Sequence, residues 1–191
     1  MHTQTSDTIE VWDQVTGQTR ILFDIIDHLS PSVDRTPSSS DPDQAFFWRG
    51  CPEVEGVEDW THSNSLFVGS RGNVIMSLRH LDQIISISPD FQTLEWRLAG
   101  PGSDFAFVDP SDQFYHQHTA QQLSNGNILL VDNGNLRPGA EGGEYSRALE
   151  LELNMEDMTV TKVWEYRHPP DLFAYCCSSA TRLDNGNTIL I

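Results

Sequence analysis

The feature that most constrains the fold of this chain is a repeated segment with a Gly-Asn pair near its centre. Its three copies read HSNSLFVGSRGNVIMS from His62, HTAQQLSNGNILLVDN from His118 and SSATRLDNGNTILI from Ser178. The second and third copies align without a gap, whereas the first needs a two-residue insertion. The glycines of the three pairs are spaced by 54 and 60 residues: Gly72, Gly126 and Gly186. Recurrence at this spacing predicts one structural unit that is stacked several times.

Each copy predicts a β-hairpin followed by a second one. Asn-Gly favours a type I′ turn because both central residues tolerate positive φ, and the runs VIMS, NILLV and TILI supply the return strand. Alternating segments such as QIISISPDFQTLEWRL and RALELELNMEDMTVTKVWEYR form the second hairpin. Four short strands per repeat, with almost no helix signals, predict an all-β fold: a β-propeller of four-stranded blades. A β-sandwich with evenly spaced strands is the alternative.

The repeat predicts one propeller domain with about three blades' worth of sequence. The expected parts are 1–29 as the end of a preceding blade, 30–59 as a long acidic, Pro/Ser-rich loop, 60–112 as a blade, 113–177 as a blade, and 178–191 as the start of the next. Closing a propeller takes roughly four to eight blades. We therefore expect a fragment of a longer protein, or a chain whose missing blades come from elsewhere, and an oligomer is possible.

The charge of the chain excludes some partners. It has 28 acidic against 11 basic residues and a net charge of −17, so no basic field exists to attract nucleic acid or an anionic membrane. An anionic substrate would need a locally positive site. The sequence contains no run of about 18 apolar residues, so it predicts no membrane span. Its N-terminus lacks the basic-then-apolar layout of a signal peptide.

The three cysteines indicate neither a disulfide framework nor a zinc site. Cys51 stands alone, and Cys176 and Cys177 are adjacent, without the paired spacing that zinc ligands show. We expect the adjacent pair to be buried strand residues.

The repeat places three polar residues in equivalent positions. His62, His118 and Ser178 each stand at the start of the first strand of a copy. That strand lines the central channel of a propeller, so these residues should converge on a shared axial site. Asn64 lies on the same strand face as His62, and Arg79 follows the return strand of that blade and could supply positive charge.

His116 and His118 also share one strand face, which is a familiar arrangement for metal ligands. No carboxylate or further histidine stands at a clear spacing from them, so a metal centre is only an alternative, as is a structural role for His118. His116 lacks the equivalence with His62 and is interpreted as a bystander.

Five segments together resemble the bacterial arylsulfotransferases. They are DWTHSNSL (59–66), SLRHLDQIISI (77–87), EWRLAGPGSDF (95–105), FYHQHTAQQLSNGNILLVDNG (114–134) and YSRALELEL (145–153). The resemblance implies a six-bladed β-propeller that transfers a sulfuryl group from an aryl sulfate donor to a phenolic acceptor, with no nucleotide cofactor and no metal. It also implies a periplasmic or secreted protein, with a cytoplasmic one as the alternative.

The resemblance implies a role for each matching residue. His118 would be the nucleophile that carries the sulfuryl group as a sulfohistidine, in a ping-pong reaction. His62, Asn64 and Arg79 would bind the sulfuryl oxygens, and His62 would take the proton of the acceptor phenol.

The sequence departs from the family in two places. A histidine that the family draws from an earlier blade has no match here, and the hydroxyl residue that it uses late in the chain is assigned to Thr181, with Ser178 and Ser179 as rivals. Arg147 matches a family motif, but we expect it to hold blade structure. The alternatives to an enzyme of this family are a non-catalytic propeller that binds partners and a metal-dependent enzyme that uses His116 and His118.

Overall fold

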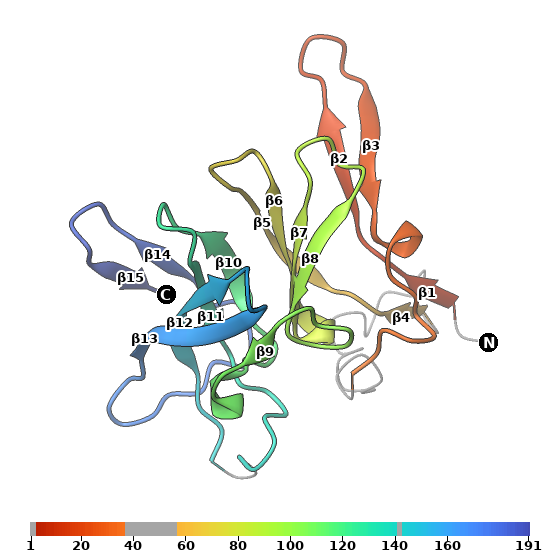
Figure 1. Ribbon diagram of the computed structural model, residues 1–191. Coiled ribbons are helices and arrows are strands. Elements are labelled where there is room, and N and C mark those ends of the chain that lie inside the picture. The colour runs from red at the N-terminus through yellow and green to blue at the C-terminus, as the bar shows by residue number, and fades with distance from the viewer. Residues whose placement is uncertain (1–2, 37–56, 141–142) are drawn as a thin grey trace.

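The computed structural model describes residues 3–36, 57–140 and 143–191 and is built of β-strands (Figure 1). The helical turns in these residues are short 3₁₀ helices: η1 (Ile25–Asp27), η5 (Arg79–Leu81) and η6 (Pro110–Asp112). No helix in the described part of the chain is long and apolar enough to span a membrane. Of the loop predicted over 30–59, residues 37–56 lie outside the described residues.

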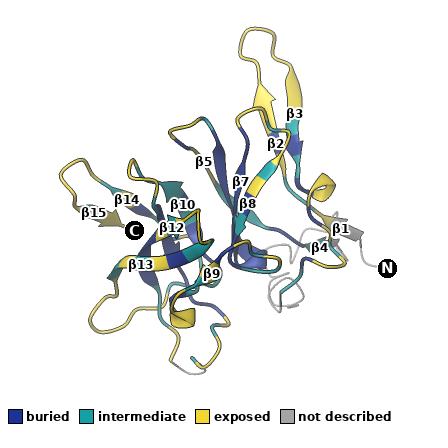
Figure 2. Ribbon diagram, in the orientation of Figure 1, coloured by how far each residue is buried: buried dark blue, intermediate teal, exposed yellow. Residues whose placement is uncertain are grey.

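The first complete blade is a four-stranded antiparallel meander in the order β5-β6-β7-β8. Its strands are β5 (Ser63–Val68), β6 (Val74–Leu78), β7 (Gln83–Ile87) and β8 (Leu94–Leu98). The central strands β6 and β7 are buried at every position, which Figure 2 shows as dark ribbon. Burial on both faces of a strand requires a packed layer on each side of the sheet.

The second blade contains five strands, one more than the repeat predicts. Its order is β10-β11-β12-β13-β9, where β10 is His118–Gln122, β11 Ile128–Asp132, β12 Arg147–Asn154 and β13 Thr159–Tyr166. The extra strand β9 (Ala106–Phe107) runs parallel to β13, and the amides of Ala106 and Val108 donate to the carbonyls of Met158 and Val160. The segment that leaves the first blade thus covers the beginning of the outer strand of the second, which shortens its unpaired edge.

Partial blades flank the two complete ones. The hairpin β2 (Thr8–Trp12) and β3 (Thr19–Asp24) precedes them, and the hairpin β14 (Ala180–Arg182) and β15 (Thr188–Leu190) follows them. A parallel pair joins β1 (Thr3–Thr5) to β4 (Val57–Asp59), which brings the start of the chain beside the segment before β5.

The Gly-Asn hairpins have a different turn from the predicted one. In the second copy Leu123 N donates to Asn127 O at 2.8 Å and Gly126 N donates to Leu123 O at 2.9 Å, and the other two copies repeat this pattern. Only Gly126 has positive φ, at 92°, whereas a type I′ turn needs it at both central residues. The loop is therefore three residues long with glycine in the left-handed position, and the type I′ prediction was wrong.

The cores lie between consecutive blades. One cluster fills the space between the two complete sheets: Ile75, Ile84, Trp96, Leu98, Ala99, Phe105, Phe114, Ala120, Ile128, Leu130, Leu149, Leu151 and Val160. A second cluster joins the opposite face of the first blade to the β2–β3 hairpin, and a smaller third one joins β11 to β14. Each sheet therefore packs on both faces against its neighbours in chain order, as propeller blades do.

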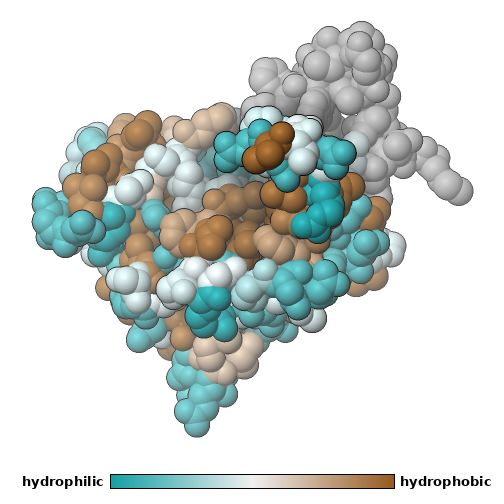
Figure 3. Space-filling view, turned by 90° about the horizontal axis from the view of Figure 1, so that it is seen from above, coloured by the Kyte–Doolittle hydropathy of each residue, from teal (hydrophilic) through white to brown (hydrophobic). Residues whose placement is uncertain are grey.

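The first strands of successive blades lie side by side, which sets the geometry of the site. Ala120 N donates to Ser65 Oγ at 3.1 Å, and Gln121 Nε2 donates to Ala180 O at 2.6 Å. β5, β10 and β14 are thus linked at the inner edge of their blades. All three strands start at the same end of the molecule, opposite the hairpin turns (Figure 1). Figure 3 views the molecule from the side of these turns and shows apolar residues around a hollow there.

Candidate active site

His118 lies at the beginning of β10, where the pairing with β11 brings it beside the end of that strand. The partner of His118 in the ladder is Val131, and the chain continues from there through Asp132 to Asn133. The side chain of His118 is almost wholly buried, and its Nδ1 lies 2.7 Å from Asn133 Oδ1. The start of β10 therefore places this histidine beside the end of β11.

The hydrogen bonds of Asn133 determine the tautomer of His118. Asn133 Nδ2 donates to Ala174 O at 2.8 Å and lies 3.3 Å from Ser178 Oγ, so Oδ1 is the atom that accepts from the imidazole. Nδ1 of His118 accordingly carries the proton, and Nε2 carries the lone pair. Nε2 accepts the backbone N–H of Cys177 at 3.3 Å.

Burial lowers the pKa of His118, and the positive charges of Arg79 and His62 lower it further, against the hydrogen bond from Asn133. A lowered pKa keeps the imidazole neutral at pH 7. A neutral ring with one nitrogen fixed as donor leaves the other available as a nucleophile.

Arg79 brings a fixed positive charge to this place. It opens η5 directly after β6, its side chain is fully buried, and Nη2 donates to Tyr175 O at 3.3 Å. Burial lowers the pKa of Arg79, but an arginine stays protonated in proteins. In a chain of charge −17 this guanidinium supplies the local positive field that an oxyanion needs.

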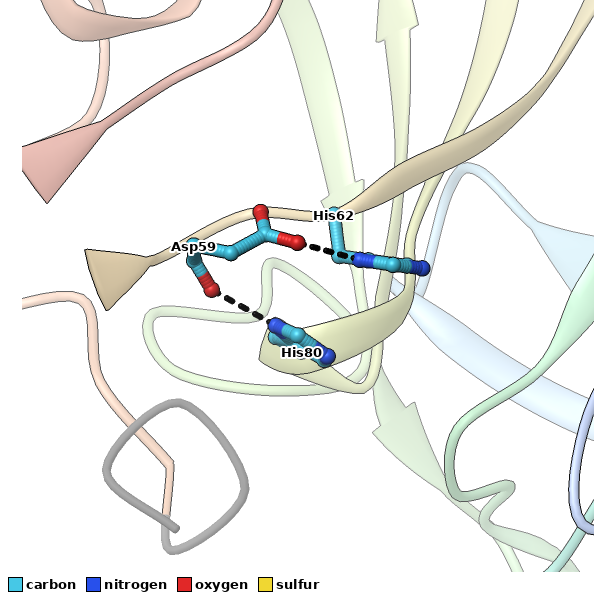
Figure 4. Close-up of side chains that lie close together, drawn as sticks. All are labelled: Asp59, His62 and His80. Atoms are coloured by element: carbon cyan, nitrogen blue, oxygen red, sulfur yellow. Dashed lines mark hydrogen bonds and ion pairs between the residues drawn. The ribbon is translucent and has the colours of Figure 1, made fainter. Parts of the chain in front are cut away.

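His62 is oriented by a carboxylate and by a second histidine (Figure 4). Its Nδ1 forms a hydrogen-bonded ion pair with Asp59 Oδ2, and Nε2 points away from Asp59. The ring of His80 stacks on it with centroids 4.4 Å apart, and His80 Nδ1 donates to the carbonyl of Asp59 at 2.6 Å. Burial, and next the charge of His62, lowers the pKa of His80 to about 3, so His80 is neutral packing for its neighbour.

Asn64 supports the backbone just before His118. Its Nδ2 donates to Gln117 O at 2.7 Å, and the Gln117 side chain donates in turn to Ser77 Oγ and Gln83 O. Oδ1 of Asn64 is buried and has no hydrogen-bond partner among the described residues. The structure thus connects Asn64 to the position of His118, while its predicted contact with sulfuryl oxygens stays a prediction.

Comparison with known proteins identifies the family of the chain. The family model described as arylsulfotransferase (ASST) matches residues 2–191. The chain belongs to the arylsulfotransferase family. A curated relative is the arylsulfate sulfotransferase AssT of Escherichia coli O6:H1, which is 28% identical over 144 residues; the match covers 56% of this chain and 23% of AssT. The chain thus spans about a quarter of the length of that arylsulfotransferase.

The hydroxyl residues late in the chain differ in their connection to His118. Ser178 is buried and bonded to Asn133, which itself holds His118. Thr181 lies exposed on β14, and no side-chain bond joins it to His118 among the residues described. Of the three hydroxyls that the sequence proposed, Ser178 is the one linked to the histidine, and a role for Thr181 stays a prediction.

Arg147 holds the blade together, as expected. Its Nε donates to Asp132 Oδ2 at 2.8 Å, and Nη2 donates to the carbonyls of Ser111 and Gln113 at 3.0 Å each. These contacts tie the segment before β10 to the start of β12. Arg147 therefore acts on the position of the loop that leads to His118.

The prediction that Cys176 and Cys177 are buried strand residues was wrong. Both lie in the loop between β13 and β14, Cys176 half-buried and Cys177 exposed, and both are free thiols. Cys177 has a φ of 63°, which lies in the left-handed region and not in the extended region of regular strands. This left-handed backbone turns its N–H toward His118, and sequence pattern does not reveal such a contact.

His116 serves a different purpose from His118. Its ring is fully buried, its backbone N–H donates to Asp82 Oδ1 at 2.7 Å, and Nδ1 lies 3.4 Å from the same oxygen. It belongs to the support of the loop before β10. The His-x-His pair is thus divided between two environments.

Asp59, His62 and His80 could hold a metal ion. Within the described ranges they form the one group of three or more ligand residues whose donor atoms lie within 4.8 Å of one another. Two nitrogens and a carboxylate oxygen suit zinc. In this arrangement, however, Nδ1 of His62 is already hydrogen-bonded to the carboxylate, and Nδ1 of His80 is hydrogen-bonded to a carbonyl. The same three residues therefore also form a hydrogen-bonded cluster that orients His62.

Sequence reasoning missed Asp59 and Asn133. Asp59 stands three residues before His62 and Asn133 directly follows the return strand of the second copy, so both flank recognised motifs. Asp59 contacts His62 and His80, whose rings stack, and Asn133 contacts the distant loop at Ala174. No spacing in the sequence indicates these contacts. A search for amide or carboxylate residues next to each repeat boundary would have found them.

Proposed function

We propose that the protein transfers a sulfuryl group from an aryl sulfate to a phenol in two steps, through a sulfohistidine at Nε2 of His118. The observation that carries the proposal is the state of this ring: buried, neutral, with Nδ1 bonded to Asn133 and the Nε2 lone pair facing the backbone N–H of Cys177. Membership in the arylsulfotransferase family supports the reaction class.

In the first step the Nε2 lone pair attacks sulfur, the N–S bond forms and the S–O(aryl) bond breaks. The leaving phenolate takes a proton from His62 Nε2, while Asp59 accepts the Nδ1–H of His62 and keeps its orientation. His118 then carries the sulfuryl group on Nε2 and its proton on Nδ1, where Asn133 Oδ1 accepts it. Arg79 lies beside the oxygens on which charge spreads, as in phosphoryl transfer.

The second step reverses the first with another phenol. The acceptor gives its proton to His62, its oxygen attacks sulfur, and the N–S bond breaks to restore neutral His118. The N–H of Cys177 faces Nε2 in the resting protein, and we infer that it faces a sulfuryl oxygen in the intermediate. No nucleotide and no metal takes part in these steps.

The test is the release of nitrophenol from 4-nitrophenyl sulfate with a phenol acceptor, measured on the full polypeptide that carries this sequence. We expect His118→Ala to lower turnover at least about a thousandfold, because the covalent route is lost. Arg182→Gln is a suitable control, since Arg182 pairs with Glu150 away from His118. Full activity in His118→Ala would contradict the proposal.

A chelator separates this reaction from a metal-dependent one at Asp59, His62 and His80. The proposed route predicts unchanged turnover in the presence of chelator. Loss of activity with chelator, and its return with zinc, would assign the reaction to the metal cluster instead.

A further inference from the structure

The loop between β13 and β14 contains two neighbouring thiols. Cys176 is half-buried and Cys177 is exposed, and their Sγ atoms lie 3.0 Å apart. In a regular strand consecutive side chains point to opposite faces, so neighbouring thiols do not meet. Here Cys177 has a φ of 63°, and the two thiols lie on the same side of the chain. The pair is therefore placed for a reaction between its two sulfur atoms.

The backbone between these thiols is also part of the site at His118. The N–H of Cys177 lies 3.3 Å from His118 Nε2, and the carbonyl of Tyr175 accepts from Arg79 Nη2 at 3.3 Å. A left-handed backbone is disfavoured for a residue with a Cβ, and residues held in such a conformation tend to lie at functional sites. The thiol pair and the imidazole thus contact the same peptide group.

The loop is anchored on both sides of the thiols. Ahead of them Ala174 N donates to Ser146 Oγ at 2.8 Å, and behind them Ser179 and Ile191 exchange two backbone hydrogen bonds of 3.0 Å each. Because both ends are held, a turn of one peptide within the loop changes the contacts of that peptide and leaves the blades in place.

The peptide between two neighbouring cysteines has to turn when their sulfur atoms bond. Consecutive Cα atoms lie about 3.8 Å apart, below the roughly 4.4–6.8 Å that a disulfide normally spans. The ring that forms contains this one peptide group, so its closure constrains the peptide directly. Since the N–H of Cys177 belongs to the same peptide, closure would move the donor that faces His118. A disulfide formed under such a constraint is reduced more readily than an ordinary one, so the change is reversible.

We propose that Cys176 and Cys177 are a modification site, at which a peroxide closes a reversible disulfide between neighbouring residues and so withdraws the Cys177 N–H from His118. The effect on turnover rests on the function proposed above. The formation of the disulfide does not, because it depends only on the two thiols and the oxidant.

The chemistry takes two steps. The Cys177 thiolate attacks one peroxide oxygen, the O–O bond breaks, and a sulfenic acid and water form. The Cys176 thiolate then attacks the sulfur of Cys177, the S–S bond forms, and the hydroxyl group leaves as a second water. The cysteines give up two electrons and two protons in all, and hydrogen peroxide takes them up. The contact with Cys177, and next burial, raises the pKa of Cys176, so the more exposed Cys177 is the thiol that meets the oxidant first.

The first measurement is a peptide map, made without reducing agent, of the full polypeptide that carries this sequence after treatment with hydrogen peroxide. We expect the peptide that holds both cysteines to lose two hydrogen atoms and to regain them with dithiothreitol. Cys51 lies outside the described residues, so Cys51→Ser is the matched control and should close the ring in the same way. Thiols that stay free, a sulfinic acid without ring closure, or a link to Cys51 or to a second chain would overturn the proposal.

The second measurement is the pKa of His118, followed by NMR of its ring protons, which are assigned by their absence in His118→Ala. The ring is closed here with diamide, which joins thiols and does not oxidise a single thiol to a sulfinic acid. A hydrogen bond to Nε2 favours the neutral imidazole, so its loss should raise this pKa by about half a unit or more. Cys176→Ser cannot close the ring and should show no rise. An unchanged pKa in protein whose ring is closed would contradict the movement of the N–H.

The third measurement is turnover of 4-nitrophenyl sulfate before and after diamide. Closure removes a donor that we place on a sulfuryl oxygen, so kcat should fall at least about tenfold and recover with dithiothreitol. Cys176→Ser should keep its activity throughout. Equal turnover in the open and closed protein would overturn the effect on the reaction. If the reduced protein has no turnover at all, the function proposed at His118 fails, while the peptide map and the NMR titration still decide the disulfide.

Discussion

At the scale of single residues, the site depends on which nitrogen of His118 bears the proton. Asn133 fixes it because its amide nitrogen is already engaged with Ala174 and Ser178. The sequence identified His118 from its equivalence with His62 but gave no sign of Asn133, whose partners lie about forty residues further along the chain. Reactive residues such as histidine can be recognised because they recur at equivalent positions of the sequence. The groups that orient them depend on tertiary contacts, which the sequence does not show.

The pH dependence of Asn133→Asp tests this arrangement. Neutral His118 is the reactive form, and its pKa is lowered, so activity should persist below the ordinary pKa of histidine. A carboxylate in place of the amide would still accept the Nδ1–H, but its charge would favour the protonated ring and raise the pKa. We expect the acid limb of kcat/KM to move to higher pH by about one unit or more.

The comparison is Asn133→Ala, measured over the same pH range. It removes the acceptor and should lower kcat by roughly tenfold or more without moving the acid limb upward, because tautomer control is lost and no charge is added. An acid limb that is identical in the unaltered protein and in Asn133→Asp would show that His118 is not the group that titrates.

At the scale of elements, hairpins could be predicted and short edge strands could not. The Gly-Asn repeats located the hairpins formed by β5–β6, β10–β11 and β14–β15, since a glycine turn between β-rich runs is a local signal. β1 and β9 have three and two residues and no periodicity, so only their partner strands define them. The turn type was wrong because a three-residue loop uses the same glycine.

The 3₁₀ turn η5 gives a prediction about stability. His80 in this turn is buried and its pKa is lowered from 6.5 to about 3. The folded protein therefore stays neutral at His80 while the unfolded chain takes up a proton below pH 6.5, so stability is lost as pH falls from 6.5 towards 3. This one group should cost about 3 kcal/mol of unfolding free energy at pH 4 relative to pH 7.

Denaturant unfolding of His80→Asn at both pH values measures this contribution. An asparagine amide can still donate to the carbonyl of Asp59, but it does not titrate. The variant should lose less stability on acidification than the unaltered protein by about that amount. Equal losses in the two proteins would mean that His80 is not held neutral by the fold.

At the scale of the whole molecule, blades follow one another along the chain and place the starts of their first strands together. Because β5, β10 and β14 are adjacent, His62, His118 and Ser178 gather at one end of the molecule. The order of these strands could be predicted from the repeat, whereas a shared axial site for the three residues stays a prediction. The contact between the Cys177 N–H and His118 could not be predicted, because it depends on a loop outside the repeated segment.

The most direct test of sulfuryl transfer through His118 is mass spectrometry of the protein mixed with an aryl sulfate in the absence of an acceptor. We predict that the peptide containing His118 gains the mass of one SO₃ group, that phenol then removes it, and that His118→Ala gains nothing. Release of the aryl alcohol without any modification of this peptide, or with the group on another residue, would contradict the mechanism.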